Sequence, residues 1–198
     1  LPNLARRQYV LSRSLLEDAF RALLTADPEA AGKVRERDEE VDRLYFLLVR
    51  VLRSLILNPR LSEKLGISPI DCLDYRLAAS LVERIADTSV ELADLTHRFK
   101  VQGMVARRLS SLLKAVGESL SQAYEEALKA LFSRNNKIFN SALKSMEAAT
   151  LTLERLEAEA SKYGRSPPTL YILLTLTRTL LEQIKDITDL AYPRPQPA

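Results

Sequence analysis

Two runs of the sequence, residues 83–87 (ERIAD) and 182–186 (EQIKD), each carry a glutamate and an aspartate four positions apart. Positions i and i+4 lie on one face of a helix, so each run would present two carboxylates one turn apart. Two such carboxylates can share a hard cation, because oxygen ligands suit magnesium, manganese, calcium or ferric iron rather than zinc or copper. The recurrence also predicts that the chain contains two copies of one helical unit.

A second acidic pair, Asp38 and Asp42, comes from the helix predicted to precede Glu83 and Asp87. Antiparallel packing of these helices could gather the four carboxylates around one groove, where they would raise one another's pKa and favour a bound cation. Acidic pairs of this spacing also arise by chance in a chain with 26 acidic residues. The alternative is that arginines neutralise the acids in surface ion pairs; the candidates are Arg35, Arg37, Arg43, Arg76 and Arg84.

The sequence contains a single histidine and a single cysteine, which limits the metal sites and catalytic sites that it can form. Without more of these residues there is no disulfide, no thiolate metal site and no histidine-rich zinc site. His97 has no neighbouring nucleophile and acid in a recognisable catalytic arrangement, and the chain has no glycine-rich phosphate loop. A metal-dependent helical hydrolase is disfavoured because no histidine ligand accompanies the carboxylates. The sequence therefore predicts a protein that is not an enzyme.

Charge and hydropathy place the chain among ordinary globular proteins. Charged residues make up 28% of the sequence and are interspersed, and the formal net charge is only +3, so nucleic-acid binding is not implied. No apolar run is long enough to span a bilayer and no signal peptide is visible, which predicts a cytoplasmic protein without membrane insertion. The chain begins at Leu1 rather than methionine, and we expect it to be a fragment or a processed form.

Apolar periodicity and helix-breaking residues predict six long helices and no strand. The expected helices cover about 4–24, 28–57, 69–100, 105–131, 136–163 and 168–191, and residues 60–67 are expected to form a connection. The core stripe expected for the third helix contains Leu73, Leu77, Leu81, Val82, Ile85 and Leu92. Short links between long helices favour antiparallel neighbours, so the predicted fold is all-α.

The repeat extends beyond the acidic residues. Aligning Glu83 with Glu182 places apolar positions 77, 81, 82 and 85 on apolar positions 176, 180, 181 and 184. This alignment predicts two tandem three-helix bundles, a first unit at 1–103 and a second at 104–192. A proline-rich tail at 193–198 follows.

Residues 81–87 (LVERIAD) resemble the signature of the PhoU family, and residues 38–42 (DEEVD) resemble its companion acidic motif. The resemblance implies a cytoplasmic regulator of phosphate uptake that contacts a phosphate transporter ATPase or a sensor kinase and forms homo-oligomers, such as dimers. Some members of the family bind iron or other metals through acidic motifs. Archaeal-type relatives resemble this chain preceded by an AbrB-like DNA-binding domain, through which alone nucleic acid would be bound.

Carried over residue by residue, the resemblance implies a site for a divalent or ferric ion (Fe, Mn, Mg or Ca). The candidate ligands are Asp38, Asp42, Glu83, Asp87, Glu182 and Asp186. Ala86 stands where the family usually has glycine. In the second unit, Met146 and Thr150 occupy the positions aligned with Asp38 and Asp42. We therefore expect any metal to lie on the first unit.

A competing interpretation needs no metal. The chain could be a helical oligomerisation or interaction domain of a transcription regulator, because long amphipathic helices with exposed apolar positions serve that purpose as well. Metal analysis of the purified protein separates the two interpretations.

Overall fold

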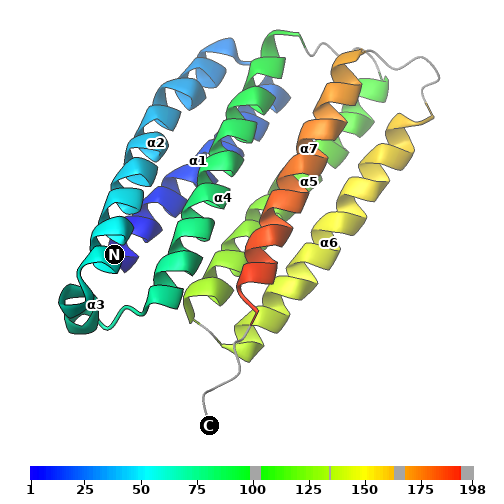
Figure 1. Cartoon of the computed structure of the whole chain (residues 1–198). Coiled ribbons are helices and arrows are strands. Elements are labelled where there is room, and N and C mark those ends of the chain that lie inside the picture. The colour runs from blue at the N-terminus through cyan, green and yellow to red at the C-terminus, as the bar shows by residue number, and fades with distance from the viewer. Residues whose placement is uncertain (99–103, 134, 163–167, 193–198) are drawn as a thin grey trace.

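The structure, a computed structural model, describes residues 1–98, 104–133, 135–162 and 168–192, which are almost entirely helical (Figure 1). Its helices are α1 (Pro2–Thr25), α2 (Pro28–Leu57), α3 (Pro59–Leu65), α4 (Pro69–Asp94), the 3-10 turn η1 (Leu95–His97), α5 (Met104–Ser133), α6 (Asn136–Ala160) and α7 (Pro168–Leu190). The described residues contain no strand. The predicted all-α fold is confirmed.

Local capping chemistry explains where the helices of the first unit begin. The Asp27 side chain accepts hydrogen bonds from the backbone N–H groups of Glu29 and Ala30, which caps α2. Ser68 and Asp71 form a reciprocal capping box at the start of α4. Proline occupies the first turn of both helices, where its missing N–H costs no hydrogen bond.

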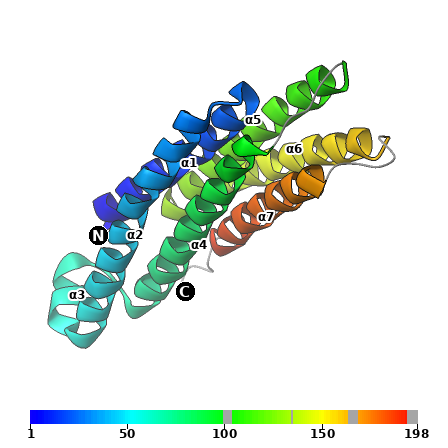
Figure 2. The same cartoon turned by 90° about the horizontal axis from the view of Figure 1, so that it is seen from above.

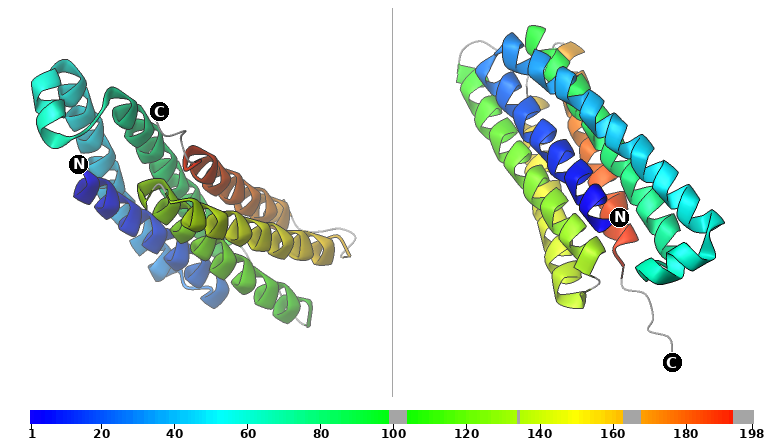
Figure 3. Two further views of the ribbon diagram at one scale, coloured as in Figure 1. Left: turned by 90° about the horizontal axis from the view of Figure 1, so that it is seen from below. Right: turned by 90° about the vertical axis from the view of Figure 1, so that its left-hand side faces the viewer.

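Consecutive long helices run in opposite directions across one bundle (Figure 1). Helices α1, α2 and α4 pack on one another, and α5, α6 and α7 form a second set. The two sets meet where α1 and α4 contact α5 and α7 (Figures 2 and 3). The predicted boundary between the units falls beside residues 99–103, and that segment and the predicted tail at 193–198 lie outside the described residues.

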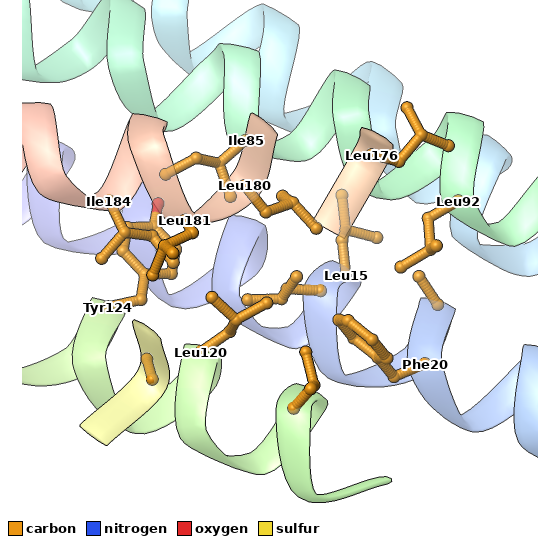
Figure 4. Packing of buried hydrophobic residues seen from close by; sticks show 14 of the residues in the cluster. Leu15, Phe20, Ile85, Leu92, Leu120, Tyr124, Leu176, Leu180, Leu181 and Ile184 are labelled. Atoms are coloured by element: carbon orange, nitrogen blue, oxygen red, sulfur yellow. The ribbon is translucent and has the colours of Figure 1, made fainter. Parts of the chain in front are cut away.

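One hydrophobic core joins the two sets of helices. Figure 4 shows Leu15, Phe20, Ile85, Leu92, Leu120, Tyr124, Leu176, Leu180, Leu181 and Ile184 in this core. The buried hydroxyl of Tyr124 donates to Ser12, whose own hydroxyl donates to the Val82 carbonyl. This chain of hydrogen bonds satisfies the polar atoms at the contact between α5, α1 and α4.

Two expectations about the first unit were wrong. Residues 59–65 form the short helix α3 rather than a plain connection, and Gly66 ends it in the left-handed conformation at φ 63°. Leu73 and Leu77 are 63% and 51% exposed, not buried. An i, i+4 series rotates about 40° around the helix at each step, so the series that faces the core at Ile85 faces solvent two and three steps earlier.

Candidate metal centre

The antiparallel packing of α2 on α4 brings together acids from both helices. Asp38, Asp42 and Asp87 each offer a carboxylate oxygen, and these three oxygens lie within 4.8 Å of one another. Asp38 and Asp42 are half-buried, whereas Asp87 is exposed. The cluster therefore lies at the rim of the α2–α4 contact, with one side open to solvent.

The apolar residues between the acids explain this placement. Val41 and Ile85 are completely buried, and each lies within the sequence span of an acidic pair. When these residues face the core, the flanking acids are turned to the edges of their helices. Ala86, which stands where the PhoU signature usually has glycine, is also completely buried.

Asp38 has the most perturbed environment of the cluster. Its Oδ1 atom is buried and has no hydrogen-bond partner among the described residues. Burial, followed by the charges of Asp42 and Asp87, raises the pKa of Asp38 to about 6. A buried carboxylate oxygen without a partner is unfavourable unless the group binds a proton or a cation.

Burial and neighbouring carboxylates also raise the pKa values of the two acids of α4, Glu83 and Asp87. Burial raises the pKa of Glu83, and Asp87, Asp42 and Asp38 raise it further. Burial also raises the pKa of Asp87, with contributions from Asp42 and then Glu91. Glu83 is thus coupled electrostatically to the cluster, although it is not among the three residues whose oxygens converge.

The arginines that could have neutralised the cluster are engaged elsewhere. Three of them form ion pairs with acids outside the cluster: Arg35 with Asp94, Arg37 with Asp18, and Arg43 with Glu39. The four carboxylates at 38, 42, 83 and 87 have no ion pair within the described part of the chain, and Arg84 has none there either. The alternative in which these arginines pair with the cluster is therefore not what the structure contains.

The fifth arginine makes a contact that the sequence did not reveal. The Arg76 guanidinium lies 5.0 Å from the centroid of the Tyr45 ring, a cation–π contact between α4 and α2. Its charge lowers the pKa of Glu83 only as the last of five causes. No local signal in the sequence predicts which arginine covers Tyr45.

The donor set of the cluster fits a hard cation. All three converging ligands are carboxylate oxygens, which suit Mg²⁺, Ca²⁺, Mn²⁺ or ferric iron. The partnerless oxygen of Asp38 supplies the second observation, because a cation would satisfy it. Occupation by a metal stays a prediction.

The second unit arranges its acids differently. Glu182 and Asp186 are exposed on α7 and belong to no cluster of three metal-ligating residues within the described ranges. Glu182 lies 3.9 Å from the ammonium of Lys185, and the neighbouring Arg178 binds Glu157 of α6. The structure therefore does not bring Glu182 and Asp186 to the cluster of the first unit, and their assignment as ligands stays a prediction.

A family model, the PhoU domain, matches residues 6–96. This segment contains most of α1, all of α2, α3 and α4, and all four acids of the first unit. Residues 6–96 belong to the PhoU domain family. The predicted family is confirmed for this unit of the chain, and the match does not extend into α5–α7.

A relative from Rhizobium meliloti (strain 1021) supports the same family. It is described as a phosphate-specific transport system accessory protein PhoU homolog. It is 31% identical over 83 residues, which are 41% of this chain and 32% of the relative. The matched part thus spans about a third of that relative's length. No solved structure matches this chain significantly.

Proposed function

We propose that this PhoU-domain protein regulates phosphate uptake by contacting a phosphate transporter ATPase or a sensor kinase, with a cation held at the acidic cluster. The observation that carries the proposal is the convergence of Asp38, Asp42 and Asp87 inside the PhoU domain without neutralising arginines. The relative's description as an accessory protein of phosphate-specific transport supports the regulatory role. We propose a role in binding rather than in turnover.

In this proposal the cation acts on the contact between α2 and α4. Asp38 and Asp42 would bind the cation from α2, and Asp87 would bind it from α4. Glu83 would contribute its negative charge or a further oxygen ligand. A bound cation supplies positive charge that removes the repulsion among these carboxylates. Because the ligands come from two helices, binding would hold the outer faces of α2 and α4 in one relative position.

Exposed apolar residues on α2 and α4, the two helices that carry the cluster, support a function in protein contacts. Phe46 follows Asp42 by four residues on α2 and is 60% exposed, with its ring 5.3 Å from that of Tyr45. Leu73 and Leu77 lie on α4 on either side of Arg76, which covers Tyr45. A surface of this composition, beside a charged site, is typical of a protein interface. The metal-free interaction domain remains the second candidate, because this apolar surface supports it equally.

Capture of the partners from cells grown with ample or scarce phosphate tests the proposal. Wild-type protein should retain the transporter ATPase or the sensor kinase in at least one condition. The variant Asp38→Asn/Asp42→Asn/Asp87→Asn should retain several-fold less, and the matched control Glu182→Gln/Asp186→Asn should behave as wild type. The proposal is contradicted if the wild-type protein captures neither partner, whether phosphate is ample or scarce. Equal capture by wild type and the triple variant would favour the metal-free interaction domain.

A further inference from the structure

The short helix α3 and the end of α2 form a tip at one end of the bundle, here called the basic tip and defined as residues 50–65. Figures 1 and 2 show α3 projecting from the corner where α2 ends and α4 begins. The tip is held firmly, because the Ser62 hydroxyl donates to the Leu55 carbonyl at 2.8 Å and both residues are buried. It therefore presents its outer side chains in a defined arrangement.

The basic tip exposes four large aliphatic side chains. The exposed fractions are 52% for Ile56, 79% for Leu57, 42% for Leu61 and 54% for Leu65. Leu61 and Leu65 lie one turn apart on α3, and Leu57 immediately precedes the cap of that helix. Single exposed leucines are common on soluble proteins, but four large aliphatic side chains within ten residues form a patch that calls for a partner.

The same tip is strongly basic. Residues 50–65 contain the cations Arg50, Arg53, Arg60 and Lys64 and the single acid Glu63, a balance of +3, which equals the formal net charge of all 198 residues. All four cations are exposed. None forms an ion pair within the described part of the chain, whereas Arg7, Arg13, Arg35 and Arg37 are all paired.

We propose that the basic tip binds the surface of a bilayer that contains anionic lipids. Unpaired cations surrounding exposed leucines match the two layers of such a surface, the anionic headgroups and the acyl chains beneath them. Leu61 and Leu65 lie on α3, which projects from the end of the bundle, and Leu57 ends α2 just before it, so one surface can reach all three. No described helix is long and apolar enough to cross a membrane, so the contact would be peripheral.

This contact is independent of the acidic cluster. Asp42 and Arg50, the first residue of the tip, are eight positions apart on α2, which is about 12 Å along a helix axis. A bilayer at the basic tip would therefore leave the cluster open to solvent or to a protein partner. Membrane binding can fail while the proposed regulatory function holds, and the reverse is equally true.

Vesicle flotation with the full chain tests the proposal. We expect the protein to bind vesicles of phosphatidylcholine with about 30% phosphatidylglycerol at least about tenfold more strongly than pure phosphatidylcholine vesicles at low salt. Raising the salt from about 50 mM to about 500 mM should weaken this binding strongly, because the Debye length becomes shorter than the gap between charges. Absence of binding to the anionic vesicles at low salt overturns the proposal.

Two pairs of variants separate the apolar and the charged contributions. Leu57→Asp/Leu61→Asp and Arg53→Glu/Arg60→Glu should each lower binding to anionic vesicles at least about tenfold, because each removes two contacts with the membrane. Helicity and thermal unfolding should stay unchanged, since these side chains are exposed and unpaired.

Helix α6 supplies matched controls. Leu143→Asp/Leu151→Asp and Lys137→Glu/Lys144→Glu change exposed leucines and exposed lysines away from the tip, and both should bind vesicles as wild type does. Equal loss in the control variants overturns the proposal, because binding would then follow total charge or hydropathy. A wild-type oligomer that Leu57→Asp/Leu61→Asp dissociates, without vesicle binding by either protein, would assign the tip to a contact between copies of the chain.

Discussion

The two units of the chain carry the same acidic spacing and build different surroundings around it. In the first unit Glu83 and Asp87 of α4 face Asp38 and Asp42 of α2, and no cation of the described chain pairs with them. In the second unit Glu182 and Asp186 are exposed, and Lys185 accompanies Glu182. The buried isoleucine between each pair of acids is the same, at 85 and at 184.

The i, i+4 spacing places two carboxylates on one face of a helix in both units. They form a candidate metal site only where a facing helix supplies further acids. Both pairs lie one turn apart on the rim of a buried stripe. Among the described residues, only the first pair meets acids from an antiparallel neighbour, and those carboxylates raise one another's pKa. The predictions below separate what the two units share from what distinguishes them.

The largest effect should be common to both units. Ile85→Ala and Ile184→Ala each empty a completely buried position, so each should lower the free energy of unfolding by about 2–5 kcal/mol. Urea unfolding in chelator at neutral pH measures both. Leu77→Ala is the control, since that side chain is half exposed and should cost below about 0.5 kcal/mol. A large cost at Leu77 would show that the exposed stripe of α4 is covered.

Cation binding should distinguish the units. Asp38→Asn/Asp87→Asn removes ligands from both helices of the first unit, so affinity for manganese or magnesium should fall at least about tenfold. Calorimetric titration of chelator-treated protein measures the change. The matched variant Glu182→Gln/Asp186→Asn should bind as wild type does. A loss of affinity in that variant alone would place the site on α7 and reverse the comparison.

Removing the charge of Asp38 should change the stability of the metal-free protein by less than the core substitutions do. Asp38→Asn should raise the free energy of unfolding at pH 7 by about 1 kcal/mol, a value reduced from the full pKa shift because the group is partly solvated. The folded-state pKa of about 6 lies above the ordinary aspartate value of 3.8, so the folded protein binds the extra proton between these two pH values. Wild-type stability from this group is therefore highest at low pH and falls as the pH rises through about 6.

Denaturation midpoints in chelator across this pH range measure the effect. The difference between Asp38→Asn and wild type should shrink below pH 5, where wild-type Asp38 is protonated. Asp186→Asn serves as the control, because it replaces an exposed aspartate outside the cluster. A constant difference from pH 4 to pH 7.5 would mean that Asp38 does not titrate in the folded protein as described.

The smallest effect should come from the ion pair of the second unit. Lys185→Gln removes the partner of Glu182, and both side chains are more than half exposed. Exposed pairs of this kind contribute little, so the free energy of unfolding should change by below about 0.5 kcal/mol. Thermal unfolding at low and high salt measures it. A larger loss would indicate that Lys185 holds α7 through contacts beyond this pair.

Much of the fold and part of the site could be predicted from the sequence. Asp27, Ser68 and the prolines beside them begin α2 and α4 through contacts within one turn, so the sequence alone predicts where these two helices start. Antiparallel packing of their helices and the family resemblance both indicate Asp38 and Asp42 as companions of Asp87, and the structure brings oxygens of these three residues together. The basic tip could not be predicted, because the residues that form α3 read as a connection.

The sequence by itself determined the long helices, their amphipathic faces and the family of the first unit, because periodicity and capping depend on residues within one or two turns. Only the tertiary structure decided which faces are covered. It buried Ile85 while exposing Leu73 and Leu77. It also paired Arg35 and Arg37 with other acids and left the Oδ1 atom of Asp38 without a hydrogen-bond partner in the described part of the chain. These outcomes depend on the rotation and axial register of one helix against another, which residues distant in sequence set together.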